Sequence, residues 1–197
     1  VFATSATWKL CEIMLLDSAH IQETEAIWRN RKAKRSGEPE YVPLYTTEDT
    51  KKCLQSFYPC SYETEYEIFD FLKIRFIDAG HLLGSASIEV TVCENNETKK
   101  ILFSGDIGNI DRPLIKNPQK PTDADIVIVE STYGDRVHGE REDYLSQLRE
   151  IINTTIGKGG NVIIPSFAVG RTQELLYLIR ILKSEGLIDE NIPVYVD

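Results

Sequence analysis

Three ionisable side chains in this 197-residue sequence stand where a predicted β-strand ends in a glycine-containing turn. The first is His81, which follows the strand-like stretch 69–76 and is flanked by Gly80 and Gly84. Glycine lets a backbone pass close to a ligand, and neutral imidazole binds zinc well. From this motif alone, a metal ligand and a hydrogen-bonded structural histidine are equally supported.

The other two side chains are carboxylates. Asp106 follows an apolar strand and is bracketed by Gly105 and Gly108. A carboxylate in that place can bridge two cations or hold one and orient a water, and the alternative is an ordinary turn. Glu130 closes the Ile- and Val-rich stretch 125–130, where a carboxylate needs a partner, unless it caps the following segment. Because successive strands each end in a titratable residue, we expect a site at one end of a sheet.

The elements that would position these residues follow from hydrophobic spacing and capping signals. A helix is predicted from a cap at Thr7 to about Lys34, and a second begins at Thr46 or Thr47. Strands are predicted at 69–76, 87–92, 100–104 and, as a buried strand, 125–130, with a turn at Asn95 and Asn96.

After residue 139 the pattern changes. An amphipathic helix, the strand 161–165, a helix over 172–184 and the strand 193–196 predict a β-α-β unit with parallel pairing. The fold class is therefore α/β, with a second domain that begins near residue 138.

Composition bounds the function. The chain is 42% apolar, with a net charge of −9, so a polyanionic substrate would need a local basic patch or a metal. Residues 29–35 are basic, although a solvated helix end is the favoured interpretation.

No apolar run is long enough for a membrane span, and no signal peptide is evident. The spacing of the four cysteines predicts free thiols in a reducing cytoplasm. The chain begins at Val1 and stops just after a predicted strand, so we expect a piece of a longer protein.

Taken together, the motifs resemble the metallo-β-lactamase fold and, within it, the β-CASP group of nucleases that act on RNA or DNA. The segments that carry the resemblance occur in the expected order along nearly the whole chain: 16–23, 80–85, 104–108, 130–134 and 165–171. The resemblance implies a partial αββα sandwich over residues 1–137, followed by the start of an inserted β-CASP α/β domain over 138–197.

The resemblance also implies roles for individual residues. His81 would be a ligand of one zinc, Asp106 would bridge two zinc ions, and Glu130 would support a catalytic histidine. Residues 166–171 would belong to the inserted β-CASP domain that covers the metal cleft. Independently of the resemblance, this turn precedes a predicted helix whose free N–H groups suit phosphate, so Ser166, Gly170 and Arg171 are predicted to contact RNA. Arg171 pairing with a carboxylate to fasten the turn is equally supported. A hydroxide held between the metals would attack a phosphodiester of RNA, with DNA as the alternative substrate. A homo-oligomer is left open.

The departures from the family pattern are equally informative. The metal motif of the form H-x-H-x-D-H is absent, and the remaining histidines, His20 and His138, match no ligand position. We therefore expect these residues alone to bind zinc weakly or not at all, and to be inactive. Two further hypotheses stay open: a pseudo-enzyme that scaffolds an RNA-processing complex, and another hydrolase of the same fold.

Overall fold

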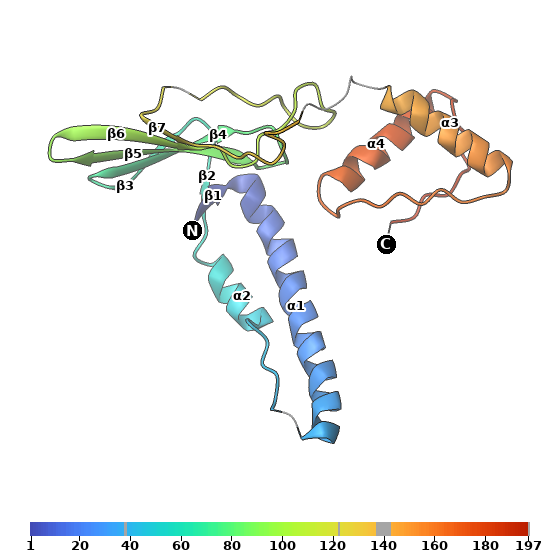
Figure 1. Cartoon of the computed structure of the whole chain (residues 1–197), viewed down its shortest axis with the longest axis horizontal. Coiled ribbons are helices and arrows are strands. Elements are labelled where there is room, and N and C mark those ends of the chain that lie inside the picture. Colours follow the sequence, from blue (N-terminus) through green and yellow to red (C-terminus); the bar gives the residue numbers. More distant parts are fainter. Residues whose placement is uncertain (38, 122, 137–142, 197) are drawn as a thin grey trace. The chain divides into compact units, whose positions relative to one another are not determined.

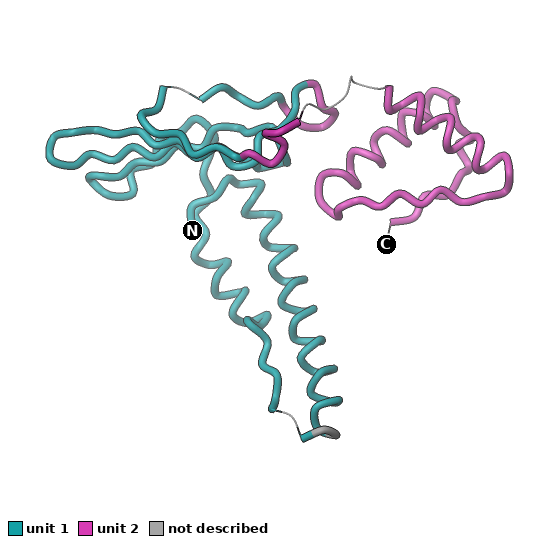
Figure 2. Tube along the Cα trace, in the orientation of Figure 1, with its two compact units in different colours: residues 1–110, 117–130 teal, residues 111–116, 131–197 magenta. Residues whose placement is uncertain are grey.

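The computed structural model describes residues 1–37, 39–121, 123–136 and 143–196. These residues group into two compact units (Figure 2). Unit 1 contains Val1–Ile110 and Asn117–Glu130, and unit 2 contains Asp111–Lys116 and Ser131–Asp197. Among the described residues, no helix is both long enough and apolar enough to cross a membrane.

Unit 1 is built on a five-stranded sheet in the order β3-β4-β5-β6-β7. Consecutive hairpins join its first four strands, which pair antiparallel (Figure 1). Asn95 and Asn96 make the last of these turns with φ angles of 52° and 65°, as expected for a two-residue hairpin loop. The strands are β3 (Glu65–Phe69), β4 (Leu72–Asp78), β5 (Ala86–Glu94), β6 (Glu97–Phe103) and β7 (Ile126–Ile128).

Strand β7 differs from the sequence prediction. It pairs parallel with β6, but it is only three residues long and lies at the edge of the sheet. Its residues and Val129 are 50–61% exposed, so the prediction of a buried strand was wrong. A run of Ile and Val signals strand formation and apolar packing, but it does not say whether a second layer covers the strand.

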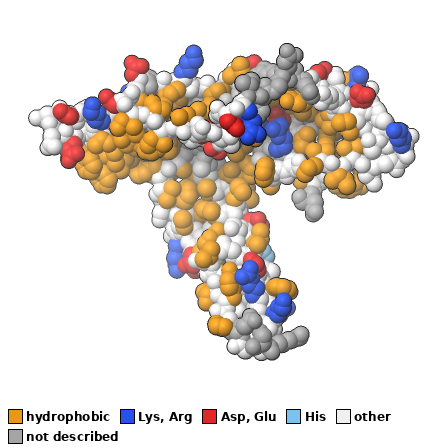
Figure 3. Space-filling view, in the orientation of Figure 1, with side chains coloured by type: hydrophobic (Ala, Val, Ile, Leu, Met, Phe, Trp, Pro, Cys, Tyr) orange, Lys and Arg blue, Asp and Glu red, His pale blue; other side chains and the backbone are white. Residues whose placement is uncertain are grey.

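One apolar row shows where the sheet is covered. The register aligns Phe76, Ile88, Phe103 and Ile128 across β4 to β7, so these side chains share one face. Phe76 is 4% exposed, whereas Phe103 is 40% and Ile128 is 50% exposed. Packing is therefore tight at β4 and opens toward β7, and hydrophobic side chains are visible over this sheet in Figure 3.

A long helix, α1 (Ser5–Ser36), precedes the sheet in the chain. Its cap is Thr4 rather than the predicted Thr7, because the Thr4 hydroxyl accepts the Thr7 N–H at 3.3 Å. Thr4 also ends the short strand β1 (Phe2–Thr4), which pairs parallel with β2 (Tyr58–Cys60).

The second helix, α2 (Thr47–Leu54), runs alongside α1 (Figure 1). Thr46 and Asp49 form a reciprocal capping box at its start, which confirms the predicted cap. Glu23 of α1 accepts hydrogen bonds from the backbone N–H of Thr47 at 3.2 Å and from its hydroxyl at 2.7 Å. One carboxylate therefore satisfies a free N–H of α2 and fastens the two helices together.

Unit 2 contains two helices, α3 (Tyr144–Gly157) and α4 (Arg171–Ser184), packed around Ile152, Leu182 and Ile188. The predicted strands at 161–165 and 193–196 are irregular segments, and Ile163 and Tyr195 are each 88% exposed. The predicted β-α-β unit was therefore wrong, because neither apolar segment has a hydrogen-bonded strand partner among the described residues.

The Glu23 contact predicts a dependence of stability on pH. The hydrogen bonds from Thr47 lower the pKa of the Glu23 carboxyl below its ordinary value of 4.5. The stabilisation is thus fully present above the unfolded pKa and is lost as the pH falls through the lower, folded pKa. We expect Glu23→Gln to reduce the melting temperature at neutral pH and to flatten its decline from about pH 5 to about pH 3. Glu40→Gln, at an exposed position, is the matched control. Equal acid slopes in wild type and Glu23→Gln would contradict this account.

Candidate functional site

The turn that carries His81 is shaped by glycines and braced by Ser85. Gly80 and Gly84 adopt φ angles of 61° and 91°, which glycine reaches without strain. The Ser85 hydroxyl oxygen accepts the backbone N–H groups of His81 at 3.0 Å and Leu82 at 3.1 Å. His81 is half-buried in this turn. The backbone around the candidate ligand is therefore fixed by a side chain within the same motif.

The loop that carries Asp106 lies directly against the His81 turn. The Gly108 N–H donates to the Ala79 carbonyl at 2.8 Å. A Cβ atom on Gly108 would come within 1.6 Å of the Gly80 carbonyl oxygen, so only glycine permits this approach. Asp106 itself is exposed. The two junctions singled out in the sequence are thus in backbone contact.

Glu130 joins the same group of loops. Its backbone N–H donates to the Ser104 hydroxyl at 3.0 Å, and its carboxylate Oε1 accepts the Ile107 N–H at 2.7 Å. The side chain therefore holds the residue that follows Asp106. The structure brings together the three loops that carry His81, Asp106 and Glu130, as the clustering of strand ends indicated.

The donor chemistry of this region fits part of a metal site. An imidazole and a carboxylate lie on adjoining loops, and both are common zinc ligands. Among the described residues, no group of three His, Cys, Asp or Glu side chains is placed to hold one ion. A tetrahedral site needs four ligands, so His81 and Asp106 fit as members of a set that these residues do not complete.

The turn at 166–171 is a separate structure in unit 2. Gly170 is the N-cap residue of α4, with φ of 85°. Its N–H donates to Gln173 Oε1, and the Ser166 and Thr172 hydroxyls are 2.7 Å apart. Arg171 contributes an Nη1 atom 2.9 Å from Glu174 Oε2. The turn is thus held by its own side chains, and Arg171 makes the carboxylate contact that sequence reasoning weighed against RNA binding.

Glu174 ties another segment to this turn. Its Oε2 also lies 3.1 Å from Arg112 Nη2, although the two residues are far apart in the sequence. The Glu174 side chain is 12% exposed and Arg171 is 59% exposed. A largely buried carboxylate therefore serves two guanidinium groups, one of which faces solvent. Arg112 and Glu174 were not singled out from the sequence, because neither belongs to a motif with a recognisable spacing.

The remaining sequence candidates lie elsewhere. His20 is exposed on α1, and His138 falls outside the described residues. In the basic stretch 29–35, Arg29 is 2.5 Å from Glu25 and stacks on Tyr41 at 4.5 Å, which supports a structural role for this residue.

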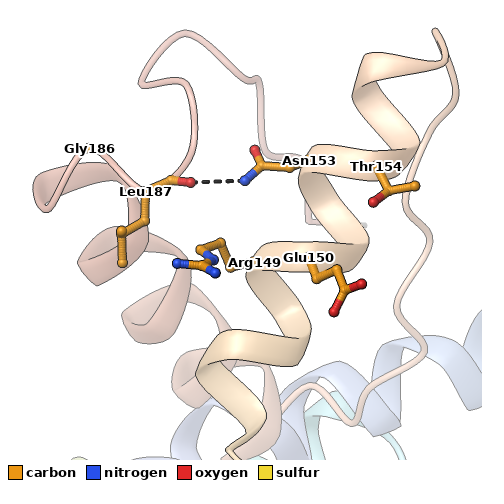
Figure 4. A pocket seen from close by; sticks show the side chains of 6 residues that line it. All are labelled: Arg149, Glu150, Asn153, Thr154, Gly186 and Leu187. Carbon is orange, nitrogen blue, oxygen red and sulfur yellow. Dashed lines mark hydrogen bonds between the residues drawn. The ribbon is translucent and has the colours of Figure 1, made fainter.

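An open hollow of about 410 Å³ lies beside α3 in unit 2. Figure 4 shows Asn153 bonded to the Leu187 carbonyl across it, with Arg149 pointing toward the same turn. None of the candidate site residues lines this hollow. Its location therefore does not connect it with the chemistry of the strand ends.

Comparison with known proteins identifies the family to which the chain belongs. It is 34% identical over 197 residues to a ribonuclease of Thermus thermophilus, an alignment that covers all of this chain and 40% of the relative. It is 38% identical over 156 residues to an RNase J-like protein of Methanocaldococcus jannaschii, covering 78% of this chain and 36% of the relative. The chain belongs to the β-CASP group of the metallo-β-lactamase family.

A further β-CASP relative is the cleavage and polyadenylation specificity factor 73 of Drosophila melanogaster, 31% identical over 153 residues, or 77% of this chain and 22% of the relative. The chain spans at most about two fifths of the length of these relatives. No known family model matches it. Membership of the metallo-β-lactamase family implies metal ions, and the mixed α/β structure is consistent with part of that fold.

The contact between the two loops can be tested with Gly108→Ala. The added Cβ would collide with the Gly80 carbonyl, so we expect a loss of about 1–3 kcal/mol in the free energy of unfolding. Gly157→Ala is the matched control, because a Cβ there meets nothing within 4 Å and alanine favours the helix end. Chemical denaturation of both variants measures the difference. Equal stability of Gly108→Ala and wild type would show that the loops are not in close contact.

Proposed function

We propose that this chain is part of a zinc-dependent ribonuclease that hydrolyses phosphodiester bonds of RNA. The observation that carries the proposal is the convergence of the His81, Asp106 and Glu130 loops at one end of the sheet. Relatives named as ribonucleases, one of them aligned over the whole chain, support the same reaction class.

In this proposal His81 and Asp106 would hold zinc as two members of its ligand set. Zinc, when bound, would polarise a phosphodiester oxygen and stabilise the charge that develops on it. Glu130 accepts the Ile107 N–H and thereby orients the backbone next to Asp106. Precise placement of the Asp106 carboxylate would matter, because groups that orient a metal ligand influence its affinity for the metal.

RNA would be held in part by the turn at 166–171, through Arg171, the Ser166 hydroxyl and the Gly170 backbone. The exposed guanidinium of Arg171 supports this role, since five N–H donors allow it to contact both Glu174 and a phosphate. Glu174 would then orient Arg171 for phosphate.

We also propose that residues 1–137 belong to a metallo-β-lactamase domain and that residues 138–197 begin a β-CASP domain. The two compact units support this division, with the difference that Asp111–Lys116 groups with the second unit. Four free cysteines support a cytoplasmic location.

The ribonuclease proposal is tested by Asp106→Ala in the full-length protein. We expect RNA cleavage to fall by at least about 100-fold, together with a loss of bound zinc, because the variant would lack one of the zinc ligands. Cleavage of a labelled RNA and metal content by elemental analysis are the measurements. Asp70→Ala, at an exposed position in a hairpin turn, is the control. A wild-type protein that binds zinc and RNA but cleaves neither RNA nor DNA would favour the scaffold hypothesis.

The role of Arg171 is tested by Arg171→Ala. We expect weaker RNA binding, with the salt dependence of log Kd reduced by about 0.7, because one contact to single-stranded phosphate is lost. The melting temperature should change little, since Arg171 is mostly exposed and Glu174 keeps its contact with Arg112 when Arg171 is removed. Arg180→Ala, exposed on the same helix, is the control. Unchanged RNA affinity with a clearly lower melting temperature would assign Arg171 to fastening the turn.

A further inference from the structure

Four side-chain hydroxyls form hydrogen bonds with the turn that carries His81. We call this group the hydroxyl clasp: Thr4, Thr7, Tyr62 and Ser85. Thr4 and Thr7 lie at the start of α1, and their hydroxyl oxygens are 2.7 Å and 2.9 Å from the Gly84 carbonyl oxygen. Tyr62 donates its hydroxyl to the Ser85 carbonyl at 2.9 Å. Contacts from two distant parts of the chain therefore meet on one short turn, which Ser85 also braces from within.

The threonine contact is tight and largely buried. Thr4 is 3% exposed and Gly84 is buried. A Cβ on Gly84 would lie 2.6 Å from the Thr7 backbone nitrogen, so the start of α1 is packed directly on the turn. The two threonine oxygens are 2.9 Å apart, and each hydroxyl has a single proton. Either both hydroxyls donate to the Gly84 carbonyl oxygen, or one hydroxyl donates to the other and the second donates to the Gly84 carbonyl oxygen.

Tyr62 adds a donor that does not titrate under ordinary conditions. Burial, and then the nearby Asp78 carboxylate, raise the pKa of Tyr62 to about 12. Its hydroxyl consequently keeps its proton and remains a donor to Ser85 well above neutral pH. Ser85 in turn accepts the N–H groups of His81 and Leu82, so the clasp reaches the candidate ligand through a single residue.

We propose that Thr7 and Tyr62, with Thr4, are positioning residues that fix the His81 backbone for metal binding. The inference rests on the proposed function for the metal, and it adds residues that lie outside the ligand motifs. Partners that orient a metal ligand commonly change affinity by about 10–100-fold when they are removed. Thr4, Thr7 and Tyr62 would thus influence the affinity of the site for zinc without being zinc ligands themselves.

The test compares Thr7→Val with Thr7→Ser in the full-length protein. Valine keeps the shape and the backbone N–H that bonds Thr4, but it removes the hydroxyl, whereas serine restores the hydroxyl. Zinc affinity, measured by competition with a chromophoric chelator, should fall about tenfold in Thr7→Val and recover to within about twofold of wild type in Thr7→Ser. Tyr62→Phe should also weaken zinc binding, and it keeps the test decisive if Thr7→Val does not fold. Thr98→Val, exposed on β6, is the matched control.

Amide hydrogen exchange of the metal-free protein gives an independent readout. The His81 and Leu82 amides should exchange about tenfold faster in Thr7→Val than in wild type, because the turn that protects them is loosened.

A lower melting temperature with unchanged zinc affinity and unchanged exchange at these two amides would overturn the proposal and leave the clasp a purely structural role. A protein that binds zinc with the expected variant pattern but does not cleave RNA would refute the proposed function while supporting the clasp. A wild type that binds no zinc would overturn both.

Discussion

The candidate site depends on one close backbone contact, between Gly108 and the turn at residues 79–81. The Gly108 N–H reaches the Ala79 carbonyl, and the space that a Cβ would need is filled by the Gly80 carbonyl. If these two loops moved apart, His81 and Asp106 would no longer lie on adjoining segments, and the Glu130 bond to Ile107 would hold an isolated loop. The side chains that could do chemistry are exposed or half-buried, but the backbone beneath them is tightly packed.

Around this contact, polar side chains are used mainly to hold backbone. Glu130 accepts one amide, Ser85 accepts two, and Glu23 binds the first turn of α2. Each of these groups satisfies backbone donors that secondary structure leaves open. Glu174 differs, because it binds the side chains of two arginines in unit 2. Motif residues in this chain therefore include many that shape loops, beside the few that could touch substrate or metal.

The sequence predicted local features well where short-range chemistry determines them. The Thr46 cap and the Asn95–Asn96 turn both follow from residue type and spacing. It failed where the outcome depends on distant partners. Residues 125–130 and 161–165 have the apolar composition of buried strands, yet one is an exposed edge and the other is irregular. The predicted cap at Thr7 was wrong because Thr4 is also a suitable capping residue. The contacts of both threonines with the Gly84 carbonyl are long-range and could not be predicted from the sequence.

The sequence separations of these contacts also have a consequence for how the site is assembled. The Glu130 contact to Ile107 spans 23 residues, whereas the Thr4 and Thr7 contacts to Gly84 span 80 and 77. Longer loops cost more chain entropy to close, and non-local contacts form late. During synthesis Thr4 and Thr7 are made well before the turn that they bind, while α1 can form helical turns locally. The geometry around His81 is thus completed when the start of α1 docks onto a turn that is synthesised about 80 residues later.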